Sequence, residues 1–155
     1  MFALVVRVRA SAEPDDSVYD TEAIGPLRAR MTEAELVKLL GKPRAKQDAI
    51  QEGATGQWVS SWEWKDSAAL MVSDSGKPPW TARDVSTSHA GWATKKKIKI
   101  GSTRREVEKA YPRAPDAPPQ QQQPDEYLVG SPYGGMLVTF TKDRVSSIAI
   151  GVFAF

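Results

Sequence analysis

The sequence of 155 residues contains no cysteine and a single histidine, His89. The absence of cysteine excludes disulfide bonds, thiol catalysis, cysteine-ligated zinc and a lipid-modified N-terminal cysteine. One histidine cannot form a multi-histidine metal site, and the chain has no Gly-x-Ser-x-Gly motif of the kind that serine hydrolases use. We therefore expect no metal, no cofactor and no enzymatic activity, and we expect His89 to lie in an exposed loop.

A strong charge of one sign and long apolar runs are also lacking. The formal net charge of +2 is too small to indicate nucleic acid or an anionic membrane as a partner. No apolar run is long enough to cross a bilayer as a helix, so we expect no integral membrane segment. The charged fraction of 26% is typical of a soluble protein.

The N-terminus has two interpretations. Phe2 to Val6 is apolar, but Arg7 and Arg9 interrupt it before it reaches the length of a secretory signal. It is either the end of a signal peptide or an edge strand in which apolar residues alternate. The first interpretation predicts a periplasmic or secreted protein, and the second a cytoplasmic one.

Two short stretches of the chain share one helix-starting pattern. Thr32-Glu33-Ala34-Glu35 and Thr103-Arg104-Arg105-Glu106 are both Thr-x-x-Glu capping boxes, and they align without a gap. Apolar residues follow each box at helical spacing, and an apolar lead-in precedes each one. Gly41 ends the first helix and Pro112 the second. This recurrence predicts a tandem repeat.

The remaining segments predict mainly β-structure. Residues 11–20 are acidic and small and predict a linker, whereas 45–52 suggest a second short helix. The segment 113–126 is rich in glutamine and proline and predicts a flexible loop. Alternation of apolar residues and turn signals predict strands at 57–65, 68–72, 81–87, 127–129, 136–140 and 145–150.

Together these elements predict an α+β fold. We expect two tandem repeats, each a short helix, or a helix-loop-helix, packed on a small antiparallel β-sheet. The predicted boundaries are an N-terminal segment at 1–23, a first repeat at 24–94 and a second repeat at 95–155. Units of about 70 residues are only marginally stable alone, which favours two repeats that share an interface.

The order of an apolar strand, a Thr-x-x-Glu helix start, an aromatic strand and a hairpin resembles the β-lactamase-inhibitor-protein fold. It is also similar to the SmpA/OmlA outer-membrane lipoproteins, which carry one copy of the motif. The resemblance covers residues 24–155 and implies a non-catalytic binding protein of the bacterial envelope or exterior. By position, Asp66 matches an aspartate that enters the target enzyme in the inhibitor. Arg30 and Ser102 depart from the motif, and the inhibitor's disulfides are absent.

The candidate partner-binding residues are mostly tryptophans. Trp58, Trp62 and Trp64 alternate onto one face of a predicted strand, just before a turn that bears Asp66. Trp80 lies near a loop and joins them. Large rigid rings dominate protein-binding hot spots, so this face predicts a surface for a protein partner, such as an envelope or secreted enzyme. The alternative is that the rings form the core beneath the helix.

Two rival functions stay open. The chain is alternatively an envelope assembly or structural factor, or a glycan-binding module that stacks its tryptophans on sugar rings. Lys95 to Lys97 with Lys99 form a basic run, which suits either an anionic partner or a solvated linker. Four carboxylates offer in principle a glycosidase pair, although their spacing fixes no separation: Glu63, Asp66, Asp74 and Asp84.

Overall fold

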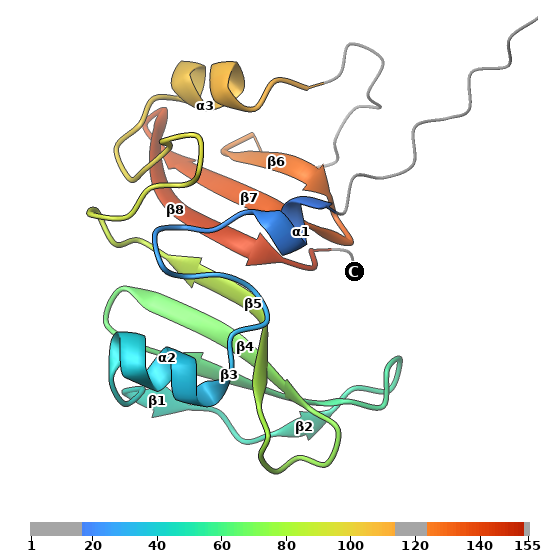
Figure 1. The fold of residues 1–155 in the computed structure, drawn as a ribbon. Helices are drawn as coiled ribbons and strands as arrows, with labels where there is room; N and C mark the ends of the chain where they lie inside the picture. Colours follow the sequence, from blue (N-terminus) through green and yellow to red (C-terminus); the bar gives the residue numbers. More distant parts are fainter. Residues whose placement is uncertain (1–16, 114–123, 154–155) are drawn as a thin grey trace, which may run out of the picture.

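The computed structural model describes residues 17–113 and 124–153. Within them, eight antiparallel strands form one sheet, in the order β1-β3-β4-β5-β8-β7-β6, with β2 also paired to β3. The strands are β1 (Ala45–Lys46), β2 (Ile50–Gln51), β3 (Trp58–Glu63), β4 (Ser67–Ser73), β5 (Thr81–Thr87), β6 (Glu126–Ser131), β7 (Gly134–Thr141) and β8 (Arg144–Gly151). Figure 1 shows this sheet as the main body of the molecule.

Three short helices accompany the sheet in the described residues. They are α1 (Ser17–Thr21), α2 (Glu33–Leu40) and α3 (Arg104–Ala110). α1 lies against β6 and β7 (Figure 1). Each of the other two buries one residue fully, Leu36 from α2 and Val107 from α3. None of these helices has the length and apolar character needed to span a bilayer.

Both predicted capping boxes are confirmed. The Thr32 hydroxyl accepts a hydrogen bond from the Glu35 backbone N–H at 3.2 Å, and the Glu35 carboxylate accepts from the Thr32 N–H at 2.9 Å. Thr103 and Glu106 make the same pair of bonds at 3.2 and 2.7 Å. Each box satisfies two backbone donors that a helix start otherwise leaves unpaired.

The predicted α+β fold of two helix-on-sheet repeats is wrong. The strands of the two halves do not form separate small sheets, because β5 pairs directly with β8 through Val85–Ile150, Ser86–Ala149 and Thr87–Ile148. This pairing removes two open sheet edges. It also creates one hydrophobic core from both halves, which offsets the small buried area of a 70-residue unit. The protein is therefore a predominantly antiparallel β-structure with short helices.

Two local predictions also fail. Residues 45–52 form β1 and β2 instead of a helix, because their backbone groups hydrogen-bond along β3, as in Ala45–Glu63 and Ile50–Val59. The predicted linker at 11–20 ends in α1, whose Val18 and Tyr19 pack against the core. The N-terminal alternatives at 1–16 and most of the Gln/Pro-rich loop lie outside the described residues.

Candidate binding surface

The predicted tryptophan face lies inside the protein. Trp62, Trp64 and Trp80 expose only 2%, 5% and 8% of their surface, and Trp58 is half-buried against the same core. The Trp62 ring lies 6.4 Å from that of Trp64 and 6.2 Å from that of Trp80, centroid to centroid. The expectation that these rings are exposed is wrong, and they form the aromatic part of the core.

Local hydrogen bonds explain why these rings are tolerated inside. The Trp62 indole N–H donates to the Ser60 hydroxyl at 2.9 Å, and that hydroxyl donates to the Gln47 carbonyl at 2.6 Å. The Trp64 indole N–H donates to the carbonyl of Gly41, at the end of α2, at 2.8 Å. A buried indole needs such a partner. The serine on the aromatic face therefore supports the core, because it satisfies the ring beside it.

Asp66 is exposed in the turn between β3 and β4, unlike the buried tryptophans. Hydrogen bonds from the end of β5 fix the turn. The Asp66 carbonyl accepts them from the Ser88 N–H at 2.8 Å and the Thr87 hydroxyl at 3.1 Å. The structure thus presents this carboxylate to solvent on a fixed turn, whereas the rings of Trp62, Trp64 and Trp80 are buried in the core.

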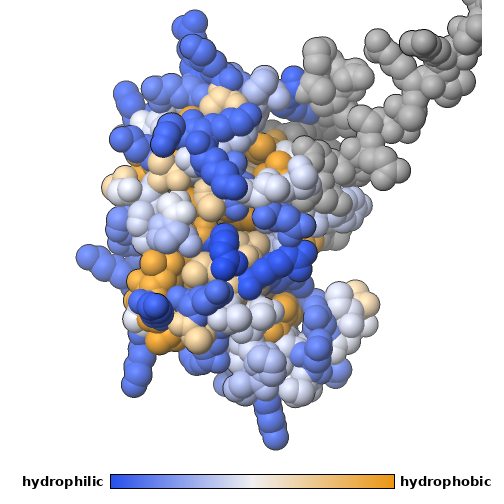
Figure 2. All heavy atoms as spheres, viewed as in Figure 1, coloured by the Kyte–Doolittle hydropathy of each residue, from blue (hydrophilic) through white to orange (hydrophobic). Residues whose placement is uncertain are grey.

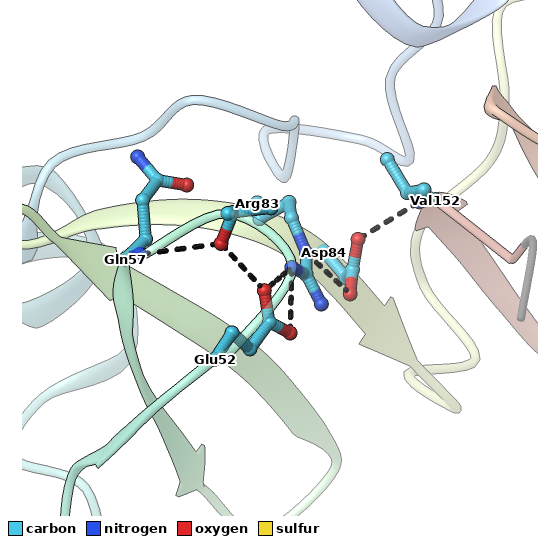
Figure 3. A network of polar contacts seen from close by, with 6 residues as sticks. Glu52, Gln57, Arg83, Asp84 and Val152 are labelled. Carbon is cyan, nitrogen blue, oxygen red and sulfur yellow. Dashed lines mark hydrogen bonds and ion pairs between the residues drawn. The ribbon is translucent and has the colours of Figure 1, made fainter.

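A polar network lies where the sheet joins its two halves (Figure 3). The Arg83 guanidinium donates to both carboxylate oxygens of Glu52 at 3.1 Å and lies 3.5 Å from a carboxylate oxygen of Asp84. Burial raises the pKa of Asp84, whereas the hydrogen bond from Arg83 lowers the pKa of Glu52. An arginine does not give up its proton in proteins, so it ties the two carboxylates together without serving as an acid or a base.

The four carboxylates considered for a glycosidase pair have separate surroundings. Glu63 pairs with Arg44 at 3.8 Å, and Asp74 accepts a hydrogen bond from the Gln57 amide at 3.3 Å. Asp84 belongs to the network with Arg83. Among the described residues, no group of three or more histidines or carboxylates is arranged to hold a metal ion. His89 is partly buried in a loop, where its ring stacks on Trp92 at 4.4 Å.

The outer face of the sheet, opposite the core, is the surface that the tryptophan prediction missed. Along β4, β7 and β8 buried residues alternate with half-exposed ones, so one face is covered and the other is accessible. One continuous row of paired residues crosses six strands on this outer face: Leu128, Leu137, Ala149, Ser86, Ala68 and Glu63. The sequence signal for this face is the presence of apolar residues, such as Leu70, Val72 and Leu137, at the strand positions between the buried ones.

Comparisons with protein families, with characterised proteins and with solved structures give no match to this chain. The likeness to the β-lactamase-inhibitor-protein fold therefore rests on the sequence motifs alone.

Proposed function

We propose that this protein is a non-catalytic, inhibitor-like binding module that contacts a partner protein through the outer face of its sheet. The observation that carries the proposal is the half-exposed aliphatic surface of that face. Leu70 and Val72 of β4 and Leu137 of β7 are only half-buried, although each sits in a central strand. Contiguous apolar patches on a protein surface mark interaction sites.

The shape of this face favours a protein over a small ligand. Small-molecule sites are concave and enclose most of the ligand. The outer face is instead an open sheet surface of mostly small and aliphatic side chains, such as Ala68 and Ala149, on which a flat partner can pack closely. Polar residues interrupt it, because Leu70 lies between Ser61 and Asp84 in the register of the strands. Asp66, on its fixed turn at one end of the sheet, supplies a charge at the rim for specificity.

The burial of the aromatic rings favours a protein partner over the glycan-binding alternative. Stacking on sugar rings needs exposed aromatic faces, and Trp62, Trp64 and Trp80 are buried. The row that crosses the outer face contains no aromatic residue. The setting in the bacterial envelope or exterior comes from the sequence resemblance and is part of the same proposal.

Site-specific photo-crosslinking tests the proposal. A photoreactive phenylalanine analogue replaces Leu70 on the outer face or, as the control, Lys38 on the exposed side of α2. We expect a defined crosslinked species from extract of the source cells with the probe at position 70 and none at 38. Leu137→Glu should abolish that species while the denaturation midpoint changes little. Equal crosslinking from both positions, or a crosslink that survives Leu137→Glu, would rule out this face as the interface.

A further inference from the structure

A basic surface surrounds α3, and none of the residues that carry the proposed function lines it. Two hollows of about 660 and 650 Å³ are lined in part by residues of α3, and Arg144 lines both. We define the α3 basic surface by the cations of these hollows that the argument uses: Lys96, Lys97, Lys99, Lys109, Lys142 and Arg144.

Positive charge is concentrated in this part of the chain. Residues 17–94 contain nine lysines and arginines and ten carboxylates, which nearly cancel. Residues 95–113 contain eight lysines and arginines and only two glutamates. The modest net charge of the whole protein therefore hides a strongly positive region. Hydrophilic side chains dominate the part of the molecule over α3 in Figure 2.

Three acidic residues line the hollows, Glu106, Glu108 and Asp143, and two of them are already engaged. The Glu106 carboxylate accepts the capping hydrogen bond from Thr103 at 2.7 Å, and Asp143 pairs with Arg104 at 3.2 Å. In the part of the chain that the structure describes, the ammonium groups of Lys97, Lys99 and Lys109 form no ion pair. Several like charges within a Debye length of one another create a positive potential that attracts anions.

Two of these lysines occupy backbone positions that favour glycine. Lys97 has a φ of 70° and Lys142 a φ of 52°, both in the left-handed region. Residues other than glycine, asparagine and aspartate rarely adopt this conformation, because the Cβ atom crowds the backbone. Lys97 lines the first hollow and Lys142 the second. Strained residues cluster at binding sites, where the side chain itself is needed. Asp143, next to Lys142, and Arg30, outside this surface, also have a positive φ, so the observation adds only that each hollow has a lysine at such a position.

We propose that the α3 basic surface binds a phosphate-bearing anion that carries several negative charges. Lysine ammonium groups are compact point charges with three donors, which suit phosphate oxygens. The described residues that line the hollows include no aromatic ring, so the surface lacks the stacking platforms of a single-stranded nucleic-acid site. Soluble polyphosphate and the headgroups of anionic lipids share the required chemistry.

Titration calorimetry with inorganic tripolyphosphate at low ionic strength tests the proposal on the full chain. The variant Lys99→Glu/Lys109→Glu changes the surface, and Lys38→Glu/Lys42→Glu makes the same change of net charge at exposed lysines on and just after α2. We expect the first variant to weaken tripolyphosphate binding by about tenfold or more and the second to leave it nearly unchanged. Thermal unfolding of both variants checks their folds. If the first fails to fold, Lys99→Gln/Lys109→Gln replaces it, with Lys38→Gln/Lys42→Gln as its control.

Co-sedimentation with phosphatidylcholine vesicles, with and without phosphatidylglycerol, separates the two sources of the anion. Binding that requires phosphatidylglycerol and is lost in the Lys99/Lys109 variant assigns the surface to lipid headgroups. Tripolyphosphate binding without vesicle binding assigns it to a soluble phosphate compound. Equal losses in the two charge-matched variants, or no binding of either probe by the natural protein, would overturn the proposal. So would tighter binding of a single-stranded oligothymidine of matched charge.

Discussion

The carboxylate of Asp84 on β5 accepts a hydrogen bond at 2.8 Å from the backbone N–H of Val152, just after β8 (Figure 3). This contact closes the join between the two halves of the sheet at the point where the pairing of β5 with β8 ends. It depends on the absence of a side chain at Gly151, since a Cβ atom there would lie 2.5 Å from an Asp84 carboxylate oxygen.

Gly151→Ala should therefore destabilise the protein by about 1–3 kcal/mol, because the added methyl group displaces the Asp84 carboxylate. Chemical denaturation measures the loss. Gly53→Ala is the matched control, since a Cβ atom at Gly53 meets nothing within 4 Å and this glycine has no positive φ. Equal midpoints for the two variants would show that the carboxylate moves aside without cost.

Truncating the aromatic core should affect folding. Trp62 is 2% exposed and contacts two other indole rings, so Trp62→Ala should cost about 3–5 kcal/mol of unfolding free energy. Tyr133 is 65% exposed in the turn between β6 and β7, and Tyr133→Ala should change stability little. A Trp62→Ala variant as stable as the Tyr133→Ala variant would contradict the core assignment.

The two capping boxes should contribute similarly. Thr32→Ala and Thr103→Ala each remove the side-chain acceptor for a helix N–H, at a cost of about 0.5–2 kcal/mol. Urea denaturation of both variants provides the measurement. The serine replacements Thr32→Ser and Thr103→Ser keep the hydroxyl and should retain most of the stability. If serine is no better than alanine, the hydroxyls do not act as caps.

Alkaline pH should unfold the protein partly through Tyr111. Its hydroxyl hydrogen-bonds with the Glu22 carboxylate at 2.9 Å and the Thr94 hydroxyl at 2.8 Å. Burial raises the pKa of Tyr111 to about 12. Because the folded pKa exceeds the value of about 10 in the unfolded chain, this stabilising contribution is complete below pH 10. It is lost as the pH rises from about 10 to about 12.

Stability curves from pH 8 to about 12 test this, with absorbance near 295 nm reporting tyrosine ionisation. Tyr111→Phe removes the titrating group, so its stability should fall less steeply over this range. At neutral pH the same variant should be less stable by about 1–3 kcal/mol, because the buried Glu22 and Thr94 lose a partner. Parallel curves for the natural protein and the variant would exclude Tyr111 as the source of the alkaline transition.

Local signals in the sequence predicted the elements whose determinants are local. A Thr-x-x-Glu box starts a helix wherever the backbone permits, so both helix starts could be predicted from four residues each. Alternation similarly predicted β3, β4, β5, β6, β7 and β8. The segment 45–52 was mispredicted because its weak helical pattern competes with backbone hydrogen bonds to β3, which no local pattern reveals.

The sequence by itself determined that three tryptophans share one strand face, and only the tertiary structure decided which way that face points. Alternation fixes which residues lie together but is identical for a buried and an exposed face. The outcome depended on contacts remote in sequence, such as the Trp64 indole with Gly41 and the pairing of Val85 with Ile150. That pairing merges two sheets into one, so the core covers the tryptophan side of β3, β4, β5, β8 and β7 and leaves Leu70 and Leu137 on the accessible side.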